Sequence, residues 1–308
     1  MTEDRSRVVV ITGASSGIGL ATAEAFARQG ANLVLAARGR SALVRTAETC
    51  VRIGAASAVA VPTDVLDADA VEHLIRTAMI LHERIDMIVH SAMVMAYGTI
   101  EELPLDVLTT VIDTATHGTA NVARSGLPVF RRQEAGTLVL VTSLLASVPV
   151  PGIGAYVTGK WGMNGLAKVL QLETADAPGV RVCTVAPGAV DTPIYRRAAN
   201  VTGRFGRPPP PVDPPEKVAR AIVRLADRPR KRVSVGLANA VVFLGFRMLP
   251  PLYDRLVGPL YDRFALSRDR VDPTTGNVLA SLEADEDGLG DPGDDNGAPV
   301  GEASGAVA

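Results

Sequence analysis

Residues 8–19 read VVVITGASSGIG, an apolar run that leads directly into three glycines, and the helical pattern LATAEAFARQG follows. The backbone N–H groups of such a turn, together with the N-terminus of the next helix, attract a pyrophosphate. Gly13 allows the tight turn, Gly17 lets the backbone approach the phosphates, and Gly19 lets the helix pack closely on the strand. An ordinary turn needs only one or two glycines, so this stretch predicts a phosphate-binding turn.

Short apolar runs alternate with long amphipathic stretches through most of the chain. Their near-continuous Val, Ile, Leu and Ala content is typical of parallel strands that helices cover on both faces. Helical patterns fill the gaps, the third of them behind the plausible N-cap Asp67. This order predicts an α/β fold of the Rossmann type, with a doubly wound, seven-stranded parallel sheet and helices on both faces. The predicted strands are Val8–Thr12, Asn32–Ala36, Ser57–Val61, Asp86–His90, Thr137–Thr142, Val180–Ala186 and Arg232–Val235.

Composition excludes several classes of protein. The 308 residues are 47% hydrophobic, which is enough for a sizeable core, and only 4% aromatic with a net charge of −2, which weighs against nucleic-acid binding. Two cysteines cannot form a disulfide framework, and the N-terminus has no signal-peptide pattern, so we expect a cytoplasmic protein. The four histidines are scattered and no metal-ligand spacing occurs, so no metal site is predicted.

The charge divides the chain into unlike parts. Residues 1–195 carry a net −3, residues 196–270 a net +10 and residues 271–308 a net −9. We expect a Rossmann-type domain over 1–236, a basic and apolar helical extension over 237–270, and an acidic disordered tail over 271–308. A Pro-rich connection at 200–215 is predicted to be non-helical and to lie on the surface. In the extension, the motif PLYDR occurs twice, and Pro259 is expected to separate two short helical turns.

The end of the second strand selects the ribose of a dinucleotide. A carboxylate there would bind a ribose 2′-hydroxyl, whereas an arginine accommodates a 2′-phosphate. The sequence reads Leu35-Ala-Ala-Arg38-Gly-Arg40, without an acidic residue at the strand tip. The arginine fork suits a phosphate, so NADP is favoured over NAD as the cofactor. The alternative is that both arginines are solvated surface residues.

Tyr156 and Lys160 are four residues apart at the start of a predicted helix and so share one helix face. A phenol has a pKa of about 10, and a neighbouring ammonium is expected to lower that pKa toward neutrality. Ser143 ends the fifth strand, where an open α/β sheet binds its ligand. A Tyr–Lys pair alone would be an ordinary helix face, but together with Ser143 and the glycine turn it predicts a catalytic group.

The sequence contains the motifs TGASSGIG (12–19), Asp64-Val65, Ser143, YVTGK (156–160) and PGAVDTP (187–193). Together they resemble the pattern of the short-chain dehydrogenase/reductase superfamily, over about residues 7–236. The resemblance implies Tyr156 as general acid/base, Ser143 as the residue that orients the carbonyl, and Lys160 as a ribose ligand that lowers the tyrosine pKa. It also implies a homodimer or homotetramer that uses the helices before and after the fifth strand. The implied cofactor-binding residues are Gly13, Ser15, Ser16, Gly17, Ile18, Gly19, Arg38, Asp64, Val65, Lys160, Pro187, Gly188, Val190 and Thr192.

Two positions depart from the family pattern. Asn-Asn-Ala-Gly after the fourth strand is replaced by HSAM from His90 onward, and the asparagine of the following long helix is replaced by Ala115. In the family that asparagine supports a water of the proton relay, so its loss puts the relay in doubt. His90, at the end of a buried strand, is more often a structural residue than a catalyst. The candidates to substitute for the asparagine, by position, are Thr114, Thr116 and His117.

The side chains around this site are largely apolar, which fits an apolar alcohol or ketone better than a sugar or an acid. We therefore predict an NADP-dependent oxidoreductase that interconverts a secondary alcohol and a carbonyl on an apolar small molecule. The alternative is a cofactor-binding sensor or scaffold with little turnover. The predicted pocket residues are Met93, Met95, Tyr97, Leu144, Leu145, Val148, Val150, Ile153, Ile194 and Tyr195, of which Leu144 is expected to be core.

The uncharged run Val233–Phe246 has two interpretations. Its fourteen residues are too few to cross a bilayer, which takes about 20. Because basic residues flank the run, residues 230–268 could make a peripheral membrane contact, with apolar burial and attraction to anionic lipid acting together. The second interpretation, which we favour, is a seventh strand followed by a helix that covers the pocket or packs on another subunit.

Overall fold

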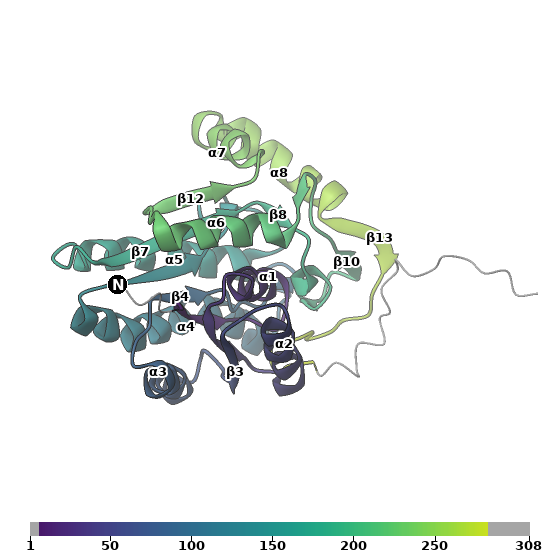
Figure 1. Cartoon of the computed structure of the whole chain (residues 1–308). Helices are drawn as coiled ribbons and strands as arrows, with labels where there is room; N and C mark the ends of the chain where they lie inside the picture. The colour runs from purple at the N-terminus through teal and green to yellow at the C-terminus, as the bar shows by residue number, and fades with distance from the viewer. Residues whose placement is uncertain (1–5, 283–308) are drawn as a thin grey trace, which may run out of the picture.

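A computed structural model describes residues 6–282 of the chain (Figure 1). Seven strands form one sheet in the order β12-β7-β6-β4-β1-β2-β3, and every neighbouring pair is parallel. The predicted doubly wound parallel sheet is therefore confirmed. The strands are β1 (Val8–Thr12), β2 (Asn32–Ala37), β3 (Ser57–Pro62), β4 (Met87–His90), β6 (Gly136–Val141), β7 (Val180–Pro187) and β12 (Arg232–Val235).

Helices cover both faces of this sheet, which explains why its strands are apolar on both sides. On one face α1 (Gly17–Ala27), α2 (Arg40–Arg52) and α6 (Pro215–Asp227) form a buried cluster with the strands. On the other face lie α3 (Ala68–His82), α4 (Leu105–Gln133) and α5 (Gly154–Glu173). Asp67 accepts hydrogen bonds from the backbone N–H groups of Asp69 and Ala70, as predicted for the N-cap of α3.

Short segments cover the carboxyl edge of the sheet. The 3-10 turn η1 (Leu144–Ala146) follows β6, and a second, η2 (Pro193–Tyr195), follows β8 (Ala189–Val190). The Pro-rich connection is not helical, as predicted, and strand pairs hold it in place. The pairs are β8 with β11 (Val212–Asp213), β5 (Ala96–Tyr97) with β9 (Ala199–Asn200), and β10 (Arg204–Gly206) with β13 (Leu266–Arg270).

Beyond β12, α7 (Asn239–Met248) and α8 (Pro250–Phe264) form a helix pair at the top of Figure 1. The expectation that Pro259 separates two turns is wrong, because α8 runs through it. The preceding residue is Gly258, which lacks the Cβ that would clash with the proline ring. The PLYDR repeat instead anchors α8: the hydroxyls of Tyr253 and Tyr261 donate to the carbonyl oxygens of Pro149 (2.6 Å) and Gly152 (3.2 Å).

Residues 271–282, which we call the strap, correct the prediction of a disordered tail from 271 onward. Thr274 forms a β-bridge with Asn200, and the backbone N–H of Asn277 donates to the carbonyl oxygen of Arg197 at 2.8 Å. Val278 is fully buried among apolar side chains, so it anchors the segment. The strap runs from β13 toward α2 in Figure 1. The rest of the predicted tail lies outside the described residues.

Candidate active site

The glycine turn after β1 borders a cavity of about 810 Å³. Gly13 and Gly17 have φ angles of +68° and +53°, a conformation that glycine adopts without strain. A Cβ added at Gly19 would lie 2.0 Å from the carbonyl oxygen of Gly13, so the close helix packing predicted from the sequence needs this glycine. Gly19 therefore lies buried behind the turn, while the other predicted turn residues, Gly13, Ser15, Ser16, Gly17 and Ile18, line the cavity.

The N-terminus of α1 faces this cavity without a side-chain cap. Ser16 is the N-cap residue, its side chain makes no cap hydrogen bond, and the first turn contains no acidic residue. The first N–H groups of any helix lack partners within the helix, and its N-terminus carries a partial positive charge. Thr192 packs against Gly17, so the segment after β7 closes over the turn. The residues present therefore fit the pyrophosphate of a dinucleotide.

Arg38 lies at the far end of the cavity with Asp64 and Val65. Its guanidinium donates to the carbonyl oxygen of Val278 at 2.9 Å and to that of Asn277, both in the strap. Burial lowers the pKa of Arg38, and the nearby charge of Asp64 opposes this effect. The interpretation as a solvated surface residue is therefore wrong for Arg38, whereas Arg40 is exposed.

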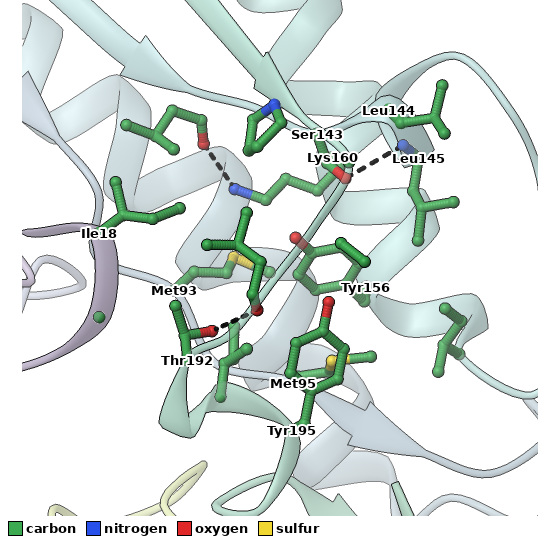
Figure 2. Close-up of a pocket in the computed structure, with 18 of the residues that line it drawn as sticks. Ile18, Met93, Met95, Ser143, Leu144, Leu145, Tyr156, Lys160, Thr192 and Tyr195 are labelled. Atoms are coloured by element: carbon green, nitrogen blue, oxygen red, sulfur yellow. Dashed lines mark hydrogen bonds between the residues drawn. The ribbon is translucent and has the colours of Figure 1, made fainter. Parts of the chain in front are cut away.

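Ser143, Tyr156 and Lys160 meet at the opposite end of the cavity (Figure 2). Ser143 follows β6 and accepts a hydrogen bond from the backbone N–H of Leu145 at 3.1 Å, which orients its hydroxyl. The first turns of α5 present Tyr156 and Lys160. The Lys160 Nζ lies 5.7 Å from the centre of the Tyr156 ring and donates to the carbonyl oxygen of Val141 at 2.8 Å.

Burial decides the electrostatics of this group. It raises the pKa of Tyr156 above its ordinary value; Tyr195 adds to the increase, and the hydrogen bond with Ser143 opposes it. Burial also lowers the pKa of Lys160 to about 7. The expected lowering of the tyrosine pKa is therefore wrong for the protein without a nucleotide. Desolvation raises the pKa of Tyr156 by more than the partly neutral Lys160 amine can lower it. The phenol holds its proton at neutral pH and can donate it to an oxygen.

His90 is a structural link between strands. It is fully buried, and its Nδ1 lies 2.9 Å from the Thr12 Oγ1, which also accepts from the backbone N–H groups of Ser91 and Ala92. Burial, reinforced by Lys160, lowers its pKa to about 3, so the ring is neutral. Its Nε2 has no hydrogen-bond partner among the described residues. The Thr12 contact supports the structural interpretation of this histidine.

Ala115 occupies the place of the family's asparagine, and it packs against α5. A Cβ added at Gly159 would come within 2.8 Å of the Ala115 Cβ, so the two helices are in close contact here. Of the three candidate substitutes only Thr114 lines the cavity, and its hydroxyl donates to the carbonyl oxygen of Thr110 at 2.7 Å. Thr116 bonds within its own helix, and His117 is exposed.

The cavity wall beyond this group is rich in phenol rings. All five tyrosines of the chain line the cavity, namely Tyr97, Tyr156, Tyr195, Tyr253 and Tyr261. Nine of the ten predicted pocket residues line it as well. Val148 is the exception, because its side chain is fully buried. Leu144 lines the cavity, although we expected it to belong to the core.

The outer wall comes from parts of the chain that the sequence predicted only in part. The favoured interpretation of Val233–Phe246 is confirmed: β12 is followed by α7, which covers the cavity. Asn239 fixes this helix, since its Nδ2 donates to the carbonyl oxygens of Ala186 and Val235. The signal missed in α8 was its leucines at four-residue spacing. Wall residues that were not predicted are Leu252, Leu256, Leu260 and Phe264 of α8, and Asn277, Ser281 and Leu282 of the strap.

Three comparisons with sequences agree with this geometry. Residues 7–201 match the family model described as short chain dehydrogenase. An uncharacterized oxidoreductase of Staphylococcus aureus is 32% identical over 230 residues, which cover 75% of this chain and 95% of the relative. The uncharacterized oxidoreductase YxnA of Bacillus subtilis is 32% identical over 258 residues, 82% of this chain and 72% of the relative.

Solved structures show the same fold with nicotinamide cofactors. An alcohol dehydrogenase from the archaeon Thermococcus sibiricus, complexed with 5-hydroxy-NADP, is 28% identical with a TM-score of 0.66, over 75% of this chain and 96% of that one. A short chain dehydrogenase/reductase from Burkholderia phymatum, in complex with NAD, is 25% identical with a TM-score of 0.71, over 89% and 99%. The neighbours thus include both forms of the cofactor.

Proposed function

The chain belongs to the short-chain dehydrogenase family, and from this premise we propose that it interconverts a secondary alcohol and a carbonyl on an apolar small molecule with NADP as cofactor. The observation that carries the proposal is the meeting of Ser143, Tyr156 and Lys160 in the cavity that the glycine turn opens on. When bound, the nicotinamide would supply or accept the hydride at the carbonyl carbon.

The phenol of Tyr156 performs the proton transfer in this proposal. In the reducing direction the Tyr156 hydroxyl donates its proton to the carbonyl oxygen, and in the oxidising direction the phenolate takes it back from the alcohol. The Ser143 hydroxyl, held by the Leu145 N–H, donates a hydrogen bond to the same oxygen and keeps it within reach. Lys160, which lines the cavity beside the phenol, would hold a cofactor hydroxyl and would support the phenolate when charged.

Arg38 supports the preference for NADP. A guanidinium has five N–H donors, and the strap carbonyls take two of them, which leaves donors for a 2′-phosphate. The strap fixes the side chain at the end of β2, so little conformational entropy is lost when a phosphate binds. In binding titrations Arg38→Ala should weaken the binding of NADPH by about tenfold or more and leave the binding of NADH almost unchanged. Equal losses for the two nucleotides would overturn the preference.

The apolar wall supports the substrate class. Met93, Met95 and Ile153 line the cavity together with the tyrosine rings, so a charged substrate would lose hydration there with little compensation.

NADPH absorbance with a panel of apolar ketones tests the activity. Tyr156→Phe should reduce the rate by about 100-fold or more, and the control Trp161→Phe, at an exposed site of α5 outside the cavity lining, should change it little. Tight NADPH binding without Tyr156-dependent turnover on any ketone would instead favour the sensor or scaffold. The features that favour this second function are Ala115 and the buried His90 in place of family asparagines.

A further inference from the structure

The outer helix pair, which we define as residues 237–264, concentrates exposed apolar side chains. Nine of the twenty large apolar side chains that are exposed among residues 6–282 lie in residues 237–260. The most exposed are Leu237 at 87%, Val241 at 72% and Met248 at 66%. Figure 1 shows α7 projecting beyond the sheet at the top of the molecule. Such a concentration of exposed apolar side chains is typical of a binding surface.

The helix α7 is apolar around its whole circumference. Its sequence NAVVFLGFRM contains one charged residue, Arg247, at its C-terminal end. Such a helix is normally buried in a core or in lipid, yet here most of its side chains are exposed. Neither helix can cross a bilayer, because 10 and 15 residues span only about 15 and 22 Å. Among the described residues no helix has the length and hydropathy of a membrane span.

Exposed cations precede the outer helix pair in the chain and also lie within it. Residues 228–253 contain five basic residues and no acidic residue. Arg228, Arg230, Lys231 and Arg232 precede the outer helix pair, and Arg247 lies within it; all five are exposed. On α8 the exposed Arg255 and Arg263 are accompanied by Asp254 and Asp262. A segment that combines exposed apolar side chains with an excess of cations complements an anionic lipid headgroup layer.

The same apolar side chains continue into the cavity. Six residues of the outer helix pair are exposed and also line the cavity, namely Leu237, Val241, Leu249, Leu252, Leu256 and Leu260. The cavity therefore opens on this surface. A second copy of the chain seated here would close the opening, whereas a lipid layer would cover the leucines and still admit apolar molecules.

We propose that the outer helix pair lies in the interfacial layer of an anionic membrane, with α7 as its main apolar contact and the cavity opening toward the acyl chains. The docking stands on exposure and charge alone. The consequence that apolar ketones or alcohols reach Tyr156 from the lipid phase rests on the proposed function.

Co-sedimentation of the full chain with vesicles tests the docking. Vesicles of phosphatidylcholine with 30% phosphatidylglycerol should bind the protein about tenfold or more better than pure phosphatidylcholine, and 0.5 M salt should reduce the difference. Leu244→Asp/Met248→Asp should abolish binding, because both side chains are exposed and neither lines the cavity. The matched control is Ile80→Asp/Leu81→Asp on α3, an exposed apolar pair that should leave binding unchanged.

A charge reversal, Arg247→Glu/Arg255→Glu, gives an independent test that leaves the apolar side chains in place. It should weaken the preference for anionic vesicles, since Arg228, Arg230, Lys231 and Arg232 remain, while NADPH binding persists. Equal sedimentation of the wild type and both variants would overturn the proposal. So would a wild-type dimer that the Leu244→Asp/Met248→Asp variant converts to monomer without any vesicle binding. Failure of the proposed function looks different: no ketone, including a water-soluble one, would then be reduced, whatever the vesicle result.

Discussion

Lys160 is a buried amine whose removal should stabilise the protein in a pH-dependent way. Its side chain is 3% exposed, and its Nζ has the Val141 carbonyl oxygen at 2.8 Å and the Met163 Sδ at 3.6 Å as partners. A single carbonyl and a thioether replace little of the hydration of an ammonium. Burial accordingly lowers the pKa of Lys160 from 10.5 to about 7.

The sign of the effect follows from proton binding in the two states. Between pH 7 and pH 10.5 the unfolded chain holds a proton on this amine and the folded chain does not, so the free energy of unfolding rises with pH. Below pH 7 both states are protonated, and the cost of the buried charge is fully present. The pKa difference of about 3.5 corresponds to ~5 kcal/mol, an upper limit because the folded state can relax.

Urea unfolding without nucleotide, at pH 6, 7.5 and 9, measures this cost. Lys160→Met keeps the length of the side chain and removes the charge, so it should be more stable than wild type by several kcal/mol at pH 6. The advantage should shrink steadily toward pH 9. Tyr156 cannot imitate this trend, because its raised pKa lowers the stability at still higher pH. The exposed Lys168→Met on the same helix is the matched control. A difference between wild type and Lys160→Met that stays constant from pH 6 to 9 would refute the reasoning.

Three further results are expected. Val278→Asp should undock the strap, because the side chain is fully buried, and should weaken NADPH binding about tenfold. The matched control Leu279→Asp, at a 45% exposed site, should bind NADPH normally, and equal binding by the two variants would contradict a role for the strap. Gly19→Ala should abolish nucleotide binding in fluorescence titrations, because its Cβ meets backbone at 2.0 Å, whereas Gly165→Ala, with open space around it in α5, should bind normally and gain ~1 kcal/mol in urea. For assembly through α4 and α5 we expect Leu172→Glu, at a 63% exposed site on α5, to lower the mass in light scattering; a wild-type monomer would contradict this.

The sheet and the nucleotide turn could be predicted because local patterns determine them. The run Val8–Thr12 is buried on both faces, so its apolar sequence defines both ends of β1. The positive φ angles of Gly13 and Gly17 are a property of single residues, which a sequence shows directly. Asp67 likewise caps α3 through bonds to residues two and three positions away.

Contacts between distant residues account for what the sequence did not predict. The composition of residues 271–308 predicts an acidic disordered tail, and nothing local in the strap shows that Val278 finds a buried site or that Arg38, 240 residues away, donates to its carbonyl oxygen. The tyrosine pKa is a similar case. The spacing of Tyr156 and Lys160 predicts proximity, but only the fold shows that both are so deeply buried that desolvation outweighs their attraction.

The part of the chain after β12 shapes both ends of the cavity rather than lying outside it. At the catalytic end, Tyr261 of α8 bonds the carbonyl oxygen of Gly152, two residues before α5 begins and four before Tyr156. At the cofactor end, the strap holds Arg38. Because β13 joins α8 to the strap, a shift of the outer helix pair would be transmitted to both contacts. A protein with the family's fold but without this extension would therefore keep the reactive residues and lose the wall that selects what reaches them.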